Sequence, residues 1–311
     1  MTESTSFQPL VSVIIPCYNR ERYISEAINS ILDQSYPFIE IIVVDDGSTD
    51  KSVEVIKSYQ DKIILIEQKN KGPSSARNTG IQNSHGELLV FLDSDDYISR
   101  DLISDHIRAF NRWPDAGVFC ANWSTFHEEM IPEVTTSDWP VEPEIPLDKI
   151  ITEHLPFPAC LMYKRKYVDL AGGFDEEMRN TEDCDFLIRA VLQGAKMVRS
   201  GGNGYATYRT TPNSITKNDG VIRFYKNQIR LVKKLLSMDC SSDSYFLSLV
   251  MNRLMKNRTD YWFGCLRWHL SLLPIEIVKF LYYLFRVSLI DFGYFGYLIK
   301  LKPWTISSQV D

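Results

Sequence analysis

The first third of the chain alternates short apolar runs with segments of helical periodicity. The apolar runs are VSVIIP at 11–16, IEIIVV at 39–44, IILIE at 63–67 and ELLVFL at 87–92. Between them lie apolar side chains at helical spacing over 21–34, a second helical stretch over 52–59 and a third over 73–83 that opens with Pro73. Strands that are apolar throughout and alternate with helices predict an α/β fold, with a parallel sheet covered on both faces.

After residue 97 the alternation is looser. A helix is expected over 100–112, a fifth strand at AGVFCAN, and a surface excursion over the Pro-rich acidic stretch 128–158. A helix that ends at Gly194 precedes two short strands, KMVRS and GYATYRT, which we expect to form a pair. The remainder is mostly helical, so we predict two domains: an α/β domain at 1–218 and a helical carboxy-terminal region at 219–311.

Charge is distributed unevenly along the chain, whose 311 residues carry a net charge of −6. Residues 1–221 hold 21 Lys and Arg against 34 Asp and Glu, whereas residues 222–310 hold 13 against 5. The acidic part argues against nucleic acid as a partner, because binding to backbone phosphates needs a basic face. The basic part favours an acidic surface such as anionic lipid.

Six cysteines without a C-x-x-C pair, and no amino-terminal signal segment, predict a cytoplasmic location.

The segment 271–301 is apolar enough to be mistaken for a membrane span. Its charged residues are Glu276, Lys279, Arg286 and Asp291, which a spanning helix would rarely tolerate. On a helical projection they fall within about 140° of arc and leave a broad apolar face. That face could lie in the inner surface of the cell membrane as a peripheral anchor, join a partner helix or a second copy in a homo-oligomer, or pack on the first domain.

Polar residues follow three of the predicted strands. Ligands of open α/β sheets bind beyond the carboxyl ends of the strands. The chain has no glycine-rich phosphate loop, so a phosphate ligand would be held through a metal. Asp93 and Asp95 carry oxygen ligands that suit Mg²⁺ or Mn²⁺. The alternative is that Asp93 or Ser94 caps the helix that follows.

Further residues have side chains suited to a nucleotide or a sugar. Tyr18 offers a ring for stacking and Asp46 an acceptor for a base N–H, although D-D-G-S is also ordinary turn chemistry. Arg77 could reach a carbonyl or phosphate oxygen, or form a salt bridge. In Thr181-Glu182-Asp183 an acidic residue could take a proton from a sugar hydroxyl, or Thr181 could simply cap the helix.

Six motifs in order resemble the family 2 glycosyltransferases of the GT-A fold. They are VSVIIPCYNRERYISEAINSILDQSY, EIIVVDDGSTD, NKGPSSARNTGI, GELLVFLDSDD, GGFDE and TEDCDFLIRA, and the resemblance runs from residue 11 to about 210. It implies a nucleotide-sugar-binding fold with a mostly parallel central sheet, in which a D-x-D motif holds a divalent metal, Mn²⁺ or Mg²⁺, on the donor diphosphate. Inverting members use an acidic residue as the catalytic base.

The resemblance also implies a role for each matching residue. Pro16, Tyr18, Asp46, Arg77 and Asp93 would bind the nucleotide, Asp95 the metal, and Asp183 would be the catalytic base. Asp96, Gly173, Phe174 and Glu182 would lie beside the donor or acceptor sugar.

The function implied is inverting transfer of a sugar from a nucleoside diphosphate, with a UDP-sugar as the expected donor. The acceptor would be a hydroxyl of a saccharide or lipid-linked saccharide, in surface polysaccharide synthesis. Two alternatives stay open, a metal-dependent nucleotidyltransferase and a non-catalytic nucleotide-binding scaffold at the membrane.

Overall fold

A computed structural model of the protein describes most of residues 8–210 and part of the chain beyond them. The gaps before residue 210 are 60, 128–132, 136–143, 153–156 and 179–180, and the later described residues are 230–231, 233–235, 237 and 249–250. All of them belong to Met1–Arg258, the first of the two units into which the chain divides. The predicted domain boundary at 218 and the segment 271–301 lie outside the described residues, and both stay predictions.

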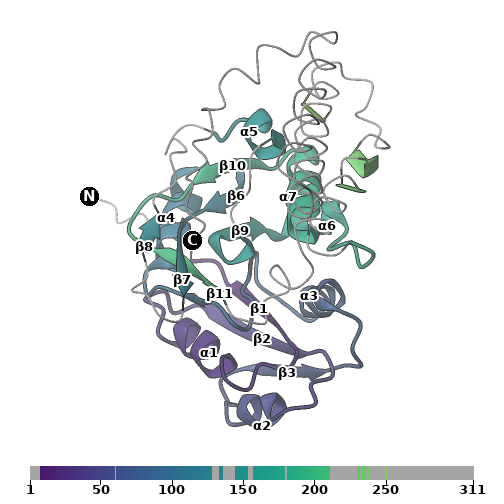
Figure 1. Ribbon diagram of the computed structural model, residues 1–311. Coiled ribbons are helices and arrows are strands. Elements are labelled where there is room, and N and C mark those ends of the chain that lie inside the picture. Colours follow the sequence, from purple (N-terminus) through teal and green to yellow (C-terminus); the bar gives the residue numbers. More distant parts are fainter. Residues whose placement is uncertain are drawn as a thin grey trace, which may run out of the picture. The chain divides into compact units, whose positions relative to one another are not determined.

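A seven-stranded sheet forms the centre of this unit (Figure 1), in the order β10-β6-β9-β4-β1-β2-β3. Its strands are β1 (Val11–Cys17), β2 (Ile39–Asp45), β3 (Ile64–Glu67), β4 (Leu88–Phe91), β6 (Ala116–Cys120), β9 (Leu161–Lys164) and β10 (Lys196–Arg199). Neighbours are parallel except at β9, which runs antiparallel to both β4 and β6. The prediction of an α/β fold with a mostly parallel sheet is confirmed.

Helices cover both faces of the sheet, because side chains alternate along each buried strand. Val13 and Ile15 of β1 pack in a cluster with α1 (Ile24–Leu32), α2 (Ser52–Lys57) and α4 (Leu102–Arg112). Ile14 faces the other way, into a cluster with α3 (Pro73–Gln82), α6 (Arg165–Ala171) and α7 (Glu182–Leu192). Burial of this apolar surface on both sides stabilises the sheet by about 25 cal/mol per Å².

A smaller second sheet has the order β5-β11-β7-β8. It consists of β5 (Tyr97–Ile98), β11 (Tyr205–Thr210), β7 (Asn122–His127) and β8 (Glu133–Thr135). The expected pairing of KMVRS with GYATYRT is therefore wrong, since β10 joins β6 in the large sheet and β11 joins β5 and β7. Between the two strands, the buried Asp105 carboxylate of α4 accepts the Gly204 N–H at 2.6 Å and so anchors the intervening loop to α4.

The stretch 128–158 is more than a surface excursion. Besides β8 it contains α5 (Leu147–Thr152), which contacts α7, and a 3₁₀ turn begins at its end (Pro158–Cys160). Ile145, Ile150 and Ile151 are buried there. Proline and acidic residues dominate the composition of this stretch and mask the few apolar side chains that anchor it to the core.

Residues beyond 218 also contribute to the core. Leu231, Leu235, Leu249 and Val250 are buried in the same cluster as α3, α6 and α7. Among the described residues, no helix combines the length and apolar character needed to cross a membrane.

Candidate active site

Three parallel neighbours, β1, β2 and β4, end at the same edge of the sheet and bring the predicted residues there. Pro16 is buried in β1, opposite Val44 of β2. Tyr18 follows β1 and is 44% exposed, so its ring is available to a ligand. Asp93 follows β4 after Leu92 and is partly exposed. The shared edge follows from the pairing of the strands in parallel register.

Arg77 joins two of the predicted acidic groups. Its Nη2 donates to Asp93 Oδ1 at 2.6 Å and its Nη1 to Glu182 Oε1 at 3.1 Å. The side chain is 4% exposed and its guanidinium lies 5.2 Å from the Phe174 ring centroid. Burial by itself would lower the pKa of Arg77, but the carboxylates of Asp93 and Glu182 raise it. One buried cation therefore links the end of β4 to the start of α7.

Asp183 lies in the first turn of α7, next to this bridge. Burial of its carboxyl group among protein atoms, followed by the negative charge of Glu182, raises the pKa of Asp183 to about 6. Its Oδ1 accepts the Cys184 N–H at 2.8 Å, and Oδ2 accepts no hydrogen bond from the residues that the structure describes. Thr181 precedes the helix, but its buried hydroxyl does not cap it.

The loop after β4 concentrates negative charge. Burial raises the pKa of Asp95, and burial together with the charges of Asp93 and Asp95 raises the pKa of Asp96 well above its usual range. The Asp95 carboxylate accepts Arg20 Nε–H at 3.2 Å, and Asp96 Oδ1 accepts the Arg209 N–H at 2.8 Å. The helix after this loop begins at Leu102 behind Asp101, so neither Asp93 nor Ser94 caps it.

This loop has the chemistry for a divalent cation. Carboxylate oxygens are the ligands that Mg²⁺ and Mn²⁺ prefer, and a cation would relieve the repulsion among the three aspartates. Over the residues that the structure describes, no group of three His, Cys, Asp or Glu side chains converges as a ready ligand set. Asp93 and Asp95 therefore fit a cation that takes its other ligands from a diphosphate and water.

Asp46 has a structural role at the end of β2. Its carboxylate, 3% exposed, accepts Gln68 Nε2–H and the backbone N–H groups of Lys71 and Gly72 at 2.8–2.9 Å. The neighbouring Asp45 makes the expected turn, with Oδ2 accepting the N–H groups of two following residues. Asp46 thus shapes the loop that leads into α3, and its contact with a nucleoside stays a prediction.

Gly173 and Phe174 are held against α3 by a single amide. Asn78 Nδ2 donates to Phe174 O at 2.9 Å, and Asn78 Oδ1 accepts the Phe174 N–H at 2.8 Å. Gly173 has φ +74°, and a Cβ there would lie 2.7 Å from Asn78 Oδ1. The GGFDE and RNTG motifs are therefore parts of one arrangement, which places Phe174 beside Arg77.

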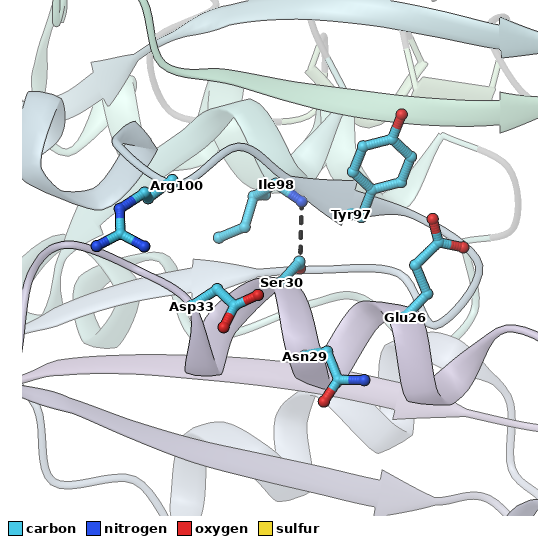
Figure 2. Close-up of a pocket in the computed structure, with 7 residues that line it drawn as sticks. All are labelled: Glu26, Asn29, Ser30, Asp33, Tyr97, Ile98 and Arg100. Atoms are coloured by element: carbon cyan, nitrogen blue, oxygen red, sulfur yellow. Dashed lines mark hydrogen bonds between the residues drawn. The ribbon is translucent and has the colours of Figure 1, made fainter.

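A hollow of about 340 Å³ lies between α1 and β5. Figure 2 shows Glu26 and Tyr97 at one end and Asp33 with Arg100 at the other. Across it, Ile98 N–H donates to Ser30 Oγ at 3.3 Å. No predicted site residue lines the hollow, although Tyr97 directly follows Asp96.

Sequence reasoning missed two arginines that contact the aspartate loop. Arg20 belongs to the quoted motif CYNR, and its position just after the first strand was a usable signal. Arg209 lies in β11, 113 residues from Asp96, and nothing in its local sequence indicated this contact.

Comparison with known proteins identifies the family. Residues 12–170, just over half of the chain, match the family model described as Glycosyl transferase family 2. An uncharacterized glycosyltransferase of Rickettsia typhi, RT0329, is 35% identical over 271 residues, which is 82% of this chain and 83% of that protein. The chain belongs to glycosyl transferase family 2, and it spans 17–63% of the length of three other curated relatives that it matches.

Solved structures agree with this assignment. Staphylococcus aureus TarS 1–349 in complex with UDP-GlcNAc has a TM-score of 0.63 and 25% identity, with 78% of this chain and 72% of that one covered. A Pyrobaculum calidifontis mannosyltransferase, PcManGT, in complex with GDP-Man and Mn²⁺, has a TM-score of 0.59 and 17% identity, with 91% and 81% covered, which is a likeness of fold. The fold is of the GT-A type, as the six motifs predicted.

Proposed function

We propose that the protein is an inverting glycosyltransferase, which moves a sugar from a nucleoside diphosphate to a hydroxyl of a saccharide or lipid-linked saccharide. The Arg77 bridge carries the proposal. It joins Asp93, which would lie on the diphosphate side, to Glu182, next to Asp183, within the span of one guanidinium. Inverting transfer needs the base and the leaving group on opposite sides of one anomeric carbon. Such positioning supplies a large part of the rate enhancement.

Asp183 would act as the general base. Its Oδ2 takes the proton of the acceptor hydroxyl while the hydroxyl oxygen bonds to the anomeric carbon. The bond from that carbon to the diphosphate oxygen breaks, and the diphosphate keeps the electron pair. The raised pKa of Asp183 makes it a stronger base than an exposed aspartate.

The remaining residues would bind the donor. Tyr18 would stack on the nucleoside, with Pro16 and Asp46 shaping its pocket. Asp95 and Asp93 would hold a divalent cation, which supplies positive charge to the departing diphosphate when bound. Asp96, Gly173, Phe174 and Glu182 would lie beside the sugars.

TarS supports the choice of donor and the class of acceptor. It is named a poly(ribitol-phosphate) beta-N-acetylglucosaminyltransferase, and its structure holds UDP-GlcNAc. UDP-GlcNAc is therefore the first donor to test, and a cell-surface polymer the first acceptor class. Cytoplasmic location, peripheral membrane contact and a homo-oligomer through the carboxy-terminal helices remain parts of this proposal.

A thermal-shift screen tests the donor. UDP-GlcNAc, UDP-glucose and GDP-mannose are each added with and without MnCl₂. A UDP-sugar with Mn²⁺ should raise the melting temperature, because a ligand that binds the native state stabilises it. If none of these donors raises it, the nucleotide-sugar function is rejected.

Asp183→Asn tests the base. The variant should keep the donor-induced thermal shift and lose about 10²- to 10⁴-fold in the rate of UDP release. The matched control is Asp169→Asn, an exposed aspartate on α6, which should behave as wild type. A fully active Asp183→Asn enzyme would reject the role of Asp183. Pyrophosphate release in place of UDP would instead indicate a nucleotidyltransferase.

A further inference from the structure

Arg209 is a buried arginine whose side chain spans the aspartate loop and helix α1. It lies in β11 of the small sheet and is 8% exposed. Its backbone N–H donates to Asp96 Oδ1 at 2.8 Å, and its Nε donates to the Asp95 carbonyl oxygen at 2.9 Å. One residue of the second sheet thus holds two consecutive residues of the loop after β4.

The far end of the same side chain is anchored as well. Arg209 Nη2 donates to the Glu26 carboxylate of α1. The guanidinium lies 5.2 Å from the Tyr23 ring centroid and 5.9 Å from that of Tyr97. A planar guanidinium can serve several partners at fixed angles, which an ammonium group cannot.

The loop needs such an anchor. Asp93, Asp95 and Asp96 stand close together, and like charges repel one another in a partly buried setting. Arg20 contacts the carboxylate of Asp95, whereas Arg209 contacts its backbone. A cation that binds Asp95 would displace or share the first contact and leave the second in place.

We propose that Arg209 is a positioning residue, which holds the backbone of Asp95 so that its carboxylate meets the divalent cation. This inference rests on the proposed function, in which Asp95 is a metal ligand. In this assignment Arg209 acts through the backbone of Asp95 and is not itself a ligand of the metal or the donor. Its effect should therefore appear in metal affinity, and not in binding of the nucleotide alone.

The test compares two arginine-to-lysine variants of the full chain. Arg209→Lys keeps a positive charge near Glu26 but loses the Nε–H that donates to Asp95. The matched control is Arg165→Lys, because Arg165 Nε donates to Gly86 O at 2.6 Å and its Nη2 to Ser84 Oγ at 2.7 Å, at the amino end of β4. Mn²⁺ binding in the presence of UDP is measured from the EPR signal of free Mn²⁺.

Arg209→Lys should weaken Mn²⁺ binding about tenfold, the effect of losing one hydrogen bond from the charged guanidinium to the Asp95 carbonyl oxygen. Arg165→Lys should stay within about twofold of wild type, and both variants should bind UDP alone as wild type does. Glu26→Gln loosens only the outer anchor and should weaken Mn²⁺ binding by about threefold. It provides the readout if Arg209→Lys does not fold.

The two proposals fail in different ways. If wild type binds Mn²⁺ with UDP and Arg209→Lys binds it equally well, the role of Arg209 is overturned and the proposed function stands. The same holds if Arg209→Lys does not fold and Glu26→Gln binds Mn²⁺ as wild type does. If wild type itself binds no Mn²⁺ with UDP, the metal-dependent function is overturned, and this inference with it.

Discussion

Asp183 combines a raised pKa with a second carboxylate oxygen, Oδ2, which we propose as the proton acceptor. A general base must be deprotonated to accept a proton. We therefore expect kcat/KM to fall as the pH decreases through about 6, a higher pH than for an ordinary aspartate. A pH–rate profile of the free enzyme checks this. A profile that stays flat between pH 5 and 7, about one pH unit on either side of the pKa of Asp183, would contradict the assignment.

The raised pKa of Asp183 also predicts that the variant Asp183→Asn gains stability while it loses activity. The pKa of Asp183 is raised by folding, so its contribution to the free energy of unfolding is most favourable below the unfolded value of 3.8. That contribution is lost as the pH rises through about 6. Asp183→Asn should therefore melt above wild type at pH 8, with the difference shrinking towards pH 4. Melting curves at several pH values check this, and a variant less stable at pH 8 would contradict it.

Two adjacent glycines allow a backbone effect to be separated from a close contact. Gly172 and Gly173 have φ of +75° and +74°, but a Cβ at Gly172 meets nothing within 4 Å, whereas one at Gly173 meets Asn78. Gly172→Ala should cost about 1 kcal/mol for the left-handed backbone. Gly173→Ala should cost about 1–3 kcal/mol more, because Asn78 must move. Urea unfolding of both variants measures the difference. Equal losses in the free energy of unfolding would show that Asn78 moves aside without cost.

Helix α7 and the segment around residue 234 are joined by a charged network. Asp185, fully buried in α7, accepts Arg189 Nε–H at 2.9 Å and Lys234 Nζ–H at 3.0 Å. Lys234 also donates to Asp175, at 2.5 Å, in the loop after α6. The network therefore ties residues beyond the predicted boundary to the helix that carries Asp183.

Removing Lys234 should destabilise this junction. Lys234→Met leaves a buried carboxylate with fewer partners and should lower the free energy of unfolding by roughly 1–3 kcal/mol. Arg230→Met is the control. Arg230 pairs with the exposed Glu177, and such surface pairs contribute about 1 kcal/mol or less. Equal losses in urea unfolding would show that the network adds nothing beyond a surface pair.

At the scale of the whole molecule, the core includes described residues that follow position 218. Leu231, Leu235, Leu249 and Val250 bury apolar surface in the cluster that also holds α3 and α7. A fragment of residues 1–218 would expose the surface that these side chains cover. It should melt well below a 1–258 fragment, or aggregate, since burial of each such side chain stabilises by about 1.5–3 kcal/mol.

Melting followed by circular dichroism compares the two fragments with the full chain. The 1–258 fragment should unfold in a single transition. If the 1–218 fragment is as stable as the longer one, the buried leucines do not belong to the folding unit.

The acidic and aromatic residues at the strand ends could be predicted from the sequence, whereas the arginines that contact them could not. Asp93 and Tyr18 follow apolar runs whose period is visible locally, so their shared edge follows from parallel pairing. Arg77 contacts Glu182 across 105 residues, and Arg209 contacts Asp96 across 113. Such partners cannot be chosen from local pattern, because many carboxylates in an acidic chain are equally available. For the same reason the partners of β10 and β11 were mistaken.

The sequence by itself determined the α/β class, the order of the strands along the chain and the motifs that place acidic groups after them, because hydrophobic periodicity and turn chemistry act over a few residues. The tertiary structure alone decided which cations hold those acidic groups, which strand joins which sheet, and why Asp183 holds its proton to a higher pH. Those properties depend on burial and on charges brought together from distant segments, which exist once the chain has folded.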